Sequence, residues 1–339
     1  MSSLAAASTT ALSDIDPPTF ADIEAAAERL KGKARLTPIL ESTLLNEKLG
    51  GRLLIKAEVL QRSGSFKFRG AYNRIALIPP AERQRGVVAY SSGNHAQGVA
   101  YAARLFGIKA WIVMPADAPK IKIANTRAYG AEVVTYDRYN ENREAIGERL
   151  TKEKGATIVR PFDDPGLIAG QGTIGLETAA QLKQMDATAD AFIAPCSGGG
   201  LIAGCALALE AKSPQTKAYA AEPAGFEDLK LSLEAGRRLE NPPGARSFCD
   251  ALLSPWPGEI TFKVHKRLLG GSFAVTDTQV QHAMATAFEY FKIVVEPGGA
   301  CGLAAVMTGQ LPIKGRTVVV VCSGGNVDPA TFAAALAAQ

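Results

Sequence analysis

The chain has 339 residues, of which 47% are hydrophobic and 21% are charged, and its formal net charge is +4. This length and composition suit a globular α/β protein, for which we expect two domains. The positive charge is spread along the sequence without a basic run, which argues against a nucleic-acid partner.

Cysteines, histidines and apolar runs exclude further classes of protein. The five cysteines include no C-x-x-C pair, which favours a reducing, cytoplasmic compartment. The three histidines show no zinc-ligand spacing. No apolar run approaches the roughly 18 residues of a membrane-spanning helix, so we expect no membrane association.

The first predicted segment is residues 1–16, which are rich in Ala, Ser and Thr. They lack the charged start and the apolar core of a signal peptide. We therefore expect a disordered N-terminal arm.

A unit of buried strand, Ser/Gly turn and helix then occurs three times. The strands are predicted at 87–90, 192–194 and 318–321, and the helices at 99–106, 201–209 and 329–336. Uninterrupted apolar runs of this kind are typical of parallel sheets that are covered on both faces. Each turn leaves backbone N–H groups free at a helix N-terminus, where such sheets bind anionic ligands.

Between the first and second units, strands at 111–114 and 132–136 and a polar helix from about 140 to 154 are predicted. These elements favour a small domain over 84–160.

The large domain is then formed by 17–83 together with 161–339, and the ligand is expected in the crevice between the domains. Residues 239–258 contain four prolines and are predicted to be an irregular surface segment.

The second turn, Ser197-Gly198-Gly199-Gly200-Leu201, allows three interpretations. Glycines at the start of a helix let backbone amides approach a phosphate closely. Gly198, Gly200 and Ala203 also match a dinucleotide-binding pattern, with Glu222 at a suitable distance to hold a ribose. Tight packing between helix and sheet explains the same glycines without any ligand.

The string Ser63-Gly64-Ser65-Phe66-Lys67-Phe68-Arg69-Gly70-Ala71 resembles the Schiff-base lysine motif of the fold-type II pyridoxal-phosphate enzymes. The resemblance is greatest to the threonine/serine dehydratases and their relatives, the serine racemases and hydroxyaspartate ammonia-lyases. Further motifs of this family follow in the same order at 91–98, 169–173, 296–300 and 322–326. The motif at 169–173 resembles the family's helix-opening segment after the small domain. The resemblance covers about residues 20–335 and implies a two-lobed, tryptophan-synthase-β-like α/β architecture with parallel twisted sheets covered by helices in both lobes.

The resemblance also implies how the cofactor, pyridoxal 5′-phosphate, is bound. Lys67 would form the Schiff base, and a lysine in a desolvated cleft has a lowered pKa that suits this reaction. The other cofactor residues implied are Phe66, Asn94, Glu296 and Ser323, with Ser197, Gly198, Gly199, Gly200 and Leu201 around the phosphate.

Ser323 would face the pyridine nitrogen with a neutral hydroxyl. A carboxylate at this position keeps the nitrogen protonated and the ring a deep electron sink, whereas a hydroxyl does not. Ser323 therefore favours prompt loss of a β-substituent over transamination. A serine in a helix-capping turn is compatible with this role.

The substrate residues implied by the resemblance are Ser91, Ser92, Asn94, His95 and Arg143. Ser92 would lie on the face of the substrate opposite Lys67, where racemases have a second acid/base. Arg143 corresponds to an arginine that reaches toward substrate in racemases, although a solvated helix face explains many of its neighbours.

A divalent-cation loop is implied at Glu222, Phe226 and Asp228, through two carboxylates and a backbone carbonyl. Such oxygen ligands suit Mg²⁺ or Ca²⁺. An acidic surface loop is an equally acceptable interpretation.

Together these patterns predict a catalytic lysine, Lys67, in a homodimeric cytoplasmic threonine/serine dehydratase that converts a small β-hydroxy amino acid to a 2-oxo acid and ammonia. A serine racemase or a threo-3-hydroxyaspartate ammonia-lyase, both sharing Lys67 and Ser92, is the alternative within the family. An NAD-dependent dehydrogenase and a non-catalytic cofactor-binding module are more remote alternatives.

Overall fold

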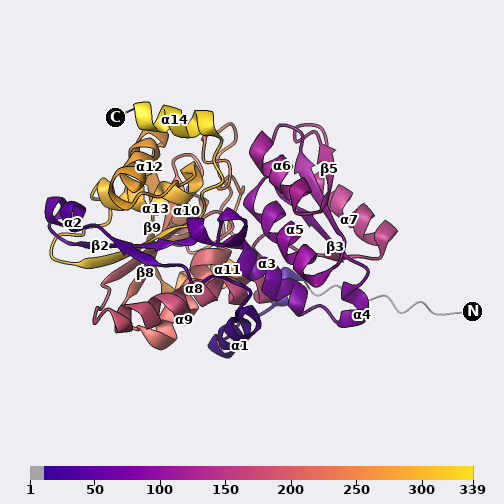
Figure 1. The fold of residues 1–339 in the computed structure, drawn as a ribbon, viewed down its shortest axis with the longest axis horizontal. Helices are drawn as coiled ribbons and strands as arrows, with labels where there is room; N and C mark the ends of the chain where they lie inside the picture. Colours follow the sequence, from indigo (N-terminus) through magenta and orange to yellow (C-terminus); the bar gives the residue numbers. More distant parts are fainter. Residues whose placement is uncertain (1–10, 339) are drawn as a thin grey trace, which may run out of the picture.

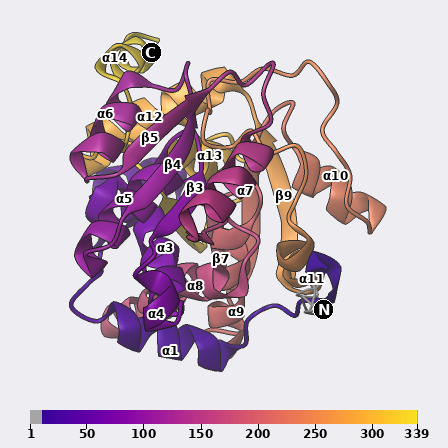
Figure 2. The ribbon, with the colours of Figure 1, turned by 90° about the vertical axis from the view of Figure 1, so that its right-hand side faces the viewer.

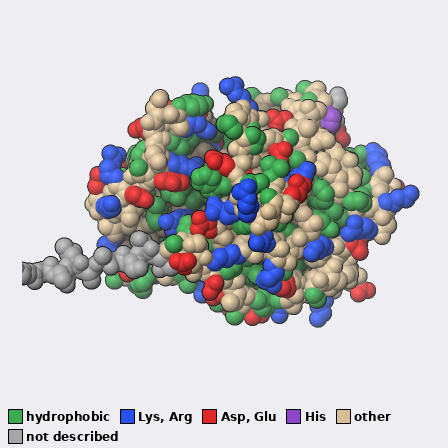
Figure 3. All heavy atoms as spheres, turned by 180° about the vertical axis from the view of Figure 1, so that it is seen from behind, with side chains coloured by type: hydrophobic (Ala, Val, Ile, Leu, Met, Phe, Trp, Pro, Cys, Tyr) green, Lys and Arg blue, Asp and Glu red, His purple; other side chains and the backbone are tan. Residues whose placement is uncertain are grey.

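The structure, a computed structural model, describes residues 11–338 as two lobes, each built around one β-sheet (Figure 1). The smaller lobe holds four strands and lies at the right of Figure 1, and the larger lobe holds six. On the face opposite to the one seen in Figure 1, basic and acidic side chains are interspersed (Figure 3).

The large sheet is mostly parallel. Only its edge pair, β1 with β2, is antiparallel among the described strands. The strands in spatial order are β1 (Ile39–Glu41), β2 (Arg52–Ala57), β10 (Thr317–Cys322), β7 (Ala191–Pro195), β8 (Lys217–Pro223) and β9 (Leu269–Val275).

Strand β10 shows why this sheet needs helices on both faces. Its Val318, Val320 and Cys322 side chains belong to one core, with α12 and α13. The alternate residues Val319 and Val321 belong to a second core on the other face, with α8 and α9. A strand buried on both sides reads as a continuous apolar run, as predicted for a parallel sheet.

The helices of the large lobe are α1 (Phe20–Leu30), α2 (Thr43–Leu49), α8 (Pro165–Gln184), α9 (Gly200–Lys212), α10 (Asp228–Ala235), α11 (Glu259–Leu268), α12 (Asp277–Phe291), α13 (Pro297–Met307) and α14 (Pro329–Ala337). Three short 3-10 helices are η1 (Leu12–Asp14), η2 (Glu58–Leu60) and η3 (Arg62–Gly64).

The small sheet is parallel throughout. Its order is β5 (Glu132–Tyr136), β4 (Ala110–Pro115), β3 (Val87–Tyr90) and β6 (Thr157–Ile158). The helices around it are α3 (Lys67–Ala76), α4 (Pro80–Arg83), α5 (Asn94–Phe106), α6 (Lys120–Ala128) and α7 (Arg143–Lys154).

Helix α3 joins the two lobes. Its Phe68, Ala71, Tyr72 and Ile75 side chains lie in the same core as β3, β4 and α5. The helix also packs against α8 of the large lobe (Figure 2). We expected residues 17–83 in the large domain, yet α3 contributes to the small-lobe core; the predicted domain limits of 84–160 stay a prediction.

Most of the predicted elements are present, with three differences. The polar helix α7 begins at Arg143, three residues after the predicted start. The motif at 169–173 lies inside α8, where Gly172 and Gly204 allow α8 and α9 to approach closely. After β10 the chain runs through residues 323–328 before α14, whose N-cap is Asp328, so Ser323 does not cap a helix.

The N-terminal arm is expected over residues 1–16, of which residues 1–10 lie outside the described part of the chain. Residues 11–16 differ from the expectation, because Leu12–Asp14 form η1 and Lys263 of α11 donates hydrogen bonds to the carbonyls of Ser13 and Ile15. Within residues 11–338, no helix combines the length and the apolar character needed to cross a membrane.

Candidate active site

A cavity of about 170 Å³ lies between the two lobes, at the carboxyl ends of strands from both sheets. It brings together every residue that we predicted for the cofactor and the substrate. These lining residues are Phe66, Lys67, Ser91, Ser92, Asn94, His95, Arg143, Ser197, Gly198, Gly199, Gly200, Leu201, Glu296 and Ser323.

Lys67 is the first residue of α3, and two turns from distant parts of the chain hold it in place. The Phe66 N–H donates to the carbonyl of Ser323 (3.0 Å), and the Gly325 N–H donates to the carbonyl of Gly64 (2.9 Å). The Lys67 amine donates to the carbonyl of Pro161 (2.7 Å). Burial lowers the pKa of this amine to about 8, so the neutral, nucleophilic fraction near neutral pH is far larger than for an ordinary lysine.

The glycine turn before α9 has the form of an anion cradle. Its N-cap is Gly199, which has φ = 93° and no side chain to cap the helix amides. From behind, α11 holds two carbonyls of the turn: Thr261 Oγ1 donates to Gly198 (2.7 Å) and His265 Nε2 to Gly199 (3.1 Å). These contacts fix the turn, and the first amides of α9, which have no intrahelical acceptor and no side-chain cap, remain for an anionic ligand.

Asn94 is oriented from the large lobe. The side-chain amide of Asn326 donates to Asn94 Oδ1 (2.8 Å) and also to the carbonyl of Ser63 (2.9 Å). The Nδ2 group of Asn94 therefore points the other way and donates to the Glu296 carboxylate. Both Asn94 and Glu296 are buried.

The substrate side of the cavity lies at the start of α5. The N-cap of this helix, Gly93, offers no side-chain cap, and its N–H donates to Ser91 Oγ (3.1 Å). His95 is buried, and its Nε2 donates to the carbonyl of Val159 (2.9 Å). Burial, aided by the nearby Lys67 charge, lowers the pKa of His95 to about 3, so the ring is neutral.

Together these residues supply the buried Lys67 amine, the free backbone amides at the start of α9, the oriented Asn94 carboxamide and the Ser323 hydroxyl. This donor set fits an aromatic aldehyde that carries a phosphate.

The sequence matches the family model described as "Pyridoxal-phosphate dependent enzyme" over residues 30–324. The chain belongs to this family. The match includes Lys67, the glycine turn and Ser323, which removes the dinucleotide-binding interpretation of Gly198, Gly200 and Ala203.

Relatives of this pyridoxal-phosphate-dependent enzyme include ammonia-lyases and racemases. The chain is 41% identical to L-threo-3-hydroxyaspartate ammonia-lyase from Pseudomonas sp over 94% of this chain and 98% of the relative. It is similar to the crystal structure of a threonine deaminase from T.th. (44% identity, TM-score 0.86, 92% of this chain and 99% of that one). It is also similar to maize serine racemase (36% identity, TM-score 0.88, 94% and 97%). The three activities occur at comparable identity, so similarity does not single out one substrate.

The predicted cation site is not supported. Glu222 already accepts hydrogen bonds from the Leu229 and Lys230 amides (2.8 and 2.9 Å) and from Ser272 Oγ (2.6 Å). Asp228 Oδ1 accepts from Asn241 (2.7 Å). Among residues 11–338, no group of three or more His, Cys, Asp or Glu side chains is placed to hold a metal ion.

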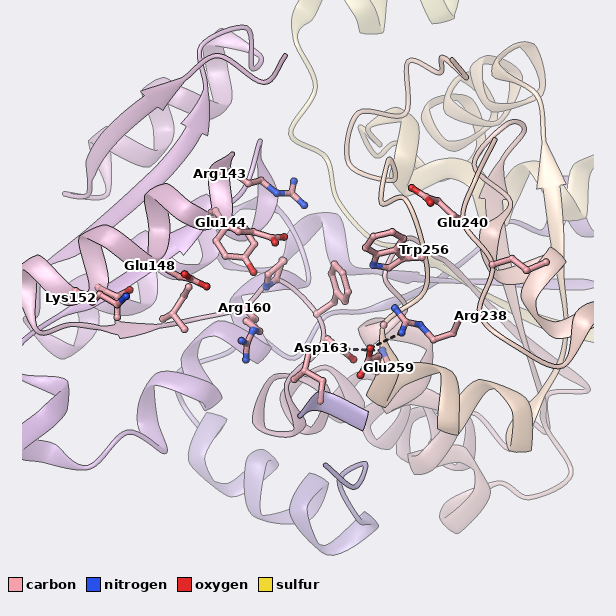
Figure 4. A pocket seen from close by; sticks show the side chains of 18 residues that line it. Arg143, Glu144, Glu148, Lys152, Arg160, Asp163, Arg238, Glu240, Trp256 and Glu259 are labelled. Carbon is pink, nitrogen blue, oxygen red and sulfur yellow. Dashed lines mark hydrogen bonds and ion pairs between the residues drawn. The ribbon is translucent and has the colours of Figure 1, made fainter. Parts of the chain in front are cut away.

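Arg143 borders a second, larger cavity of about 680 Å³ beside the first. Its guanidinium lies over the Tyr90 ring (5.5 Å to the centroid), and both residues line the two cavities. Figure 4 shows Arg143 and Glu144 of α7 facing Trp256 and Glu240 across the gap between the lobes. A position at the junction of the two cavities is compatible with the predicted substrate contact.

Three charged residues at or beside the cavity were missed in the sequence: Asp250 and Arg138 line the cavity, and Lys122 lies next to Asp250. Lys122 lies in α6 and is buried, with its amine 2.7 Å from Asp250 Oδ2 and 3.1 Å from Glu296 Oε2. Arg138 lines the cavity and pairs with Asp117 (2.8 Å). One signal was available for Lys122, because it lies between Ile121 and Ile123 as Lys67 lies between two phenylalanines.

Proposed function

We propose that the chain is a threonine/serine dehydratase, which eliminates water from a β-hydroxy amino acid and yields a 2-oxo acid and ammonia. The observation that supports this proposal is the pairing of a buried, partly neutral Lys67 with the neutral hydroxyl of Ser323 in one cavity. A neutral partner for the ring nitrogen favours loss of a β-substituent over transamination.

In this proposal the amides of 198–201 would hold the cofactor's phosphate, and Asn94, Glu296, Phe66 and Ser323 would surround its ring. When bound, pyridoxal phosphate supplies an electron sink for the negative charge that develops at the substrate Cα. The protein supplies orientation and proton transfer.

Lys67 is the proposed general base, because its neutral amine can accept the Cα proton. Loss of that proton allows the Cβ–O bond to break, and the hydroxyl leaves as water with the proton that Lys67 has taken up. We infer that the N-terminal amides of α5, with Ser91 and His95, would bind the substrate carboxylate, because they line the cavity at an uncapped helix start. His95 is a much weaker base than Lys67, because burial lowers the pKa of its ring to about 3.

Two observations keep the family alternatives as second candidates. Ser92 lines the cavity, and a hydroxyl on the substrate face opposite Lys67 would favour racemisation. Arg138 and Arg143 also line it, and two guanidinium groups would suit the second carboxylate of 3-hydroxyaspartate.

One assay separates these functions. The purified protein, loaded with pyridoxal phosphate, is incubated with L-threonine, L-serine and L-threo-3-hydroxyaspartate, and 2-oxo acids and D-serine are quantified. We expect 2-oxobutanoate from threonine and pyruvate from serine. Oxaloacetate formed from hydroxyaspartate at much higher kcat/KM would reassign the substrate, and D-serine in excess over pyruvate would make the enzyme a racemase.

Two variants control this assay. Lys67→Ala should abolish turnover, and full activity in that variant would contradict the proposed general base. Ser92→Ala should retain elimination and lose any D-serine formation. A wild-type protein that binds pyridoxal phosphate and forms no product from any of the three substrates would instead be a non-catalytic module.

A further inference from the structure

Lys122 connects the two lobes beside the proposed cofactor ring. It belongs to α6 of the small lobe, whereas its partners Asp250 and Glu296 belong to the large lobe. Its side chain is 1% exposed, and that of Glu296 is 2% exposed. A lysine is rarely buried to this extent unless it is paired.

The pKa of Lys122 and the pKa of Glu296 depend on each other. Burial raises the pKa of Glu296, and the Lys122 ammonium opposes this rise. Burial also lowers the pKa of Lys122, but Glu296 and Asp250 outweigh it, so the pKa is raised. Removing the ammonium would therefore leave the buried Glu296 carboxylate without its counter-charge.

The stem of Lys122 also packs against Gly93 of the small lobe. A side-chain carbon added at Gly93 would lie 2.6 Å from Cδ of Lys122, so the stem of the lysine occupies the space left by this glycine. Gly93 belongs to the turn that presents Ser91, Ser92 and Asn94 to the cavity. Lys122 thus contacts the turn through its stem and Glu296 through its ammonium.

Glu296 contacts both Lys122 and Asn94. One carboxylate oxygen, Oε2, lies near Lys122, and the other, Oε1, accepts from Asn94 Nδ2. The opposite side of the Asn94 amide is fixed by Asn326. The position of the Asn94 donor therefore depends on a chain of contacts from α6 in one lobe to α13 in the other.

We propose that Lys122 is a positioning residue that couples the approach of the two lobes to the alignment of the cofactor contacts. Its ammonium fixes the Glu296 carboxylate against Asn94 and draws the loop that carries Asp250 toward α6. This inference rests on the proposed binding of pyridoxal phosphate at Lys67 and Asn94.

The test compares Lys122→Met with Lys120→Met, a matched change at an exposed lysine at the start of the same helix. We measure the Kd of the apo protein for pyridoxal phosphate, the visible spectrum of the bound cofactor, and thermal unfolding. For Lys122→Met we expect Kd to rise by at least about tenfold and the spectrum to change, because an uncompensated buried charge lies beside the ring. Lys120→Met should match the wild type in all three measurements.

A second variant separates positioning from general stability. In the double variant Lys122→Met with Glu296→Gln, no buried charge needs the lysine, so we expect cofactor affinity to recover toward that of Glu296→Gln alone. A loss of affinity in the double variant equal to the sum of the two single losses would overturn the proposal. It would also be overturned if Lys122→Met lowered only the unfolding temperature and kept Kd and spectrum unchanged.

Hydrogen exchange of the apo protein tests the lobe contact without the cofactor. We expect faster exchange in α6 and at the start of α13 in Lys122→Met than in Lys120→Met. Unchanged exchange would contradict the interlobe contact. Failure of the proposed function is distinguishable, because wild-type protein would then not bind pyridoxal phosphate or would bind it without turnover, whereas the exchange difference would persist.

Discussion

At the scale of single residues, burial prepares the Lys67 amine for reaction with an aldehyde. Its pKa of about 8 means that the neutral fraction rises steeply between pH 7 and pH 9. We predict that the rate at which the apo protein captures pyridoxal, trapped by borohydride and located by mass spectrometry, increases about tenfold over this interval. A Lys67 rate that continued to rise in the same proportion above pH 9 would contradict the lowered pKa.

A second prediction concerns the carboxylates of Glu222 and Asp228. Burial raises the pKa of both, and the Asp228 charge adds to the rise at Glu222; the values are about 8 and about 7. The folded protein therefore holds more protons than the unfolded chain, and stability falls as pH increases from about 4 to 8.

Replacing Asp228 by Asn removes one of these charges and lessens the penalty at the other. We predict that Asp228→Asn is more stable than the wild type at pH 9, on the order of 2 kcal/mol, with a smaller difference at pH 5. Denaturant unfolding in the presence of a chelator measures both values. A difference that does not depend on pH would argue against the raised pKa values.

The predicted site residues that belong to contiguous motifs do lie together, although their roles stay a prediction. Lys67, Asn94, the glycine turn and Ser323 meet in one cavity because each follows a strand or begins a helix at the same edge of the sheets. The burial of Lys122 beside the site was not predicted, and the reason is physical. A lysine near the start of a helix is normally solvated, and only tertiary packing against Gly93 and Glu296 buries it.

At the scale of elements, α3 is held by a buried ionic network beneath Lys67. Arg69 donates to Glu58 through Nε (2.9 Å) and Nη2 (2.8 Å), and to Glu177 through Nη1 (2.7 Å). The Arg69 and Glu58 side chains are both fully buried. Glu177 lies in α8, so the network fastens α3 to the large lobe.

We predict that Arg69→Met lowers the free energy of unfolding by about 3–5 kcal/mol, because the buried Glu58 carboxylate loses its directly bound guanidinium and keeps only the Lys56 ammonium as a positive neighbour. Denaturant unfolding measures the loss. Arg85→Met, at an exposed arginine, is the control and should change stability little. Adding Glu58→Gln to Arg69→Met should restore part of the stability, and a further large loss would contradict this explanation.

The elements themselves could largely be predicted, since apolar runs mark the buried strands. The exceptions are those whose position depends on distant contacts. The turn after β10 does not open a helix, because residues 64–66 pair with it instead: Ser65 bridges to Gly324, and Phe66 donates to Ser323. The packing of α3 in the small-lobe core likewise arises from contacts of Phe68 and Tyr72 that no local pattern reveals.

At the scale of the whole molecule, the proposed cofactor would contact both lobes, through the start of α9 in one and Asn94 in the other. A ligand that binds only the folded form stabilises it by mass action. At a concentration of 100 times Kd, we predict that pyridoxal phosphate raises the free energy of unfolding by about 2.7 kcal/mol.

Denaturant unfolding followed by probes in each lobe checks this prediction. Pyridoxal, which lacks the phosphate, should stabilise less at the same concentration. Stabilisation confined to one lobe would contradict a site that spans both. The homodimer implied by the family resemblance stays a prediction, which sedimentation of the loaded protein can test.

The position of β10 in the large sheet also affects how the protein is made. Chains emerge from the ribosome N-terminus first, and domains generally fold as units during synthesis. The small sheet uses strands from 87–158 and can form as soon as they emerge. In the large sheet, β10 separates β2 from β7 although it is the last strand in sequence, so this sheet must wait for nearly the whole chain. Until then β2 and β7 expose unpaired edges, and this interval is when the nascent chain most needs a chaperone.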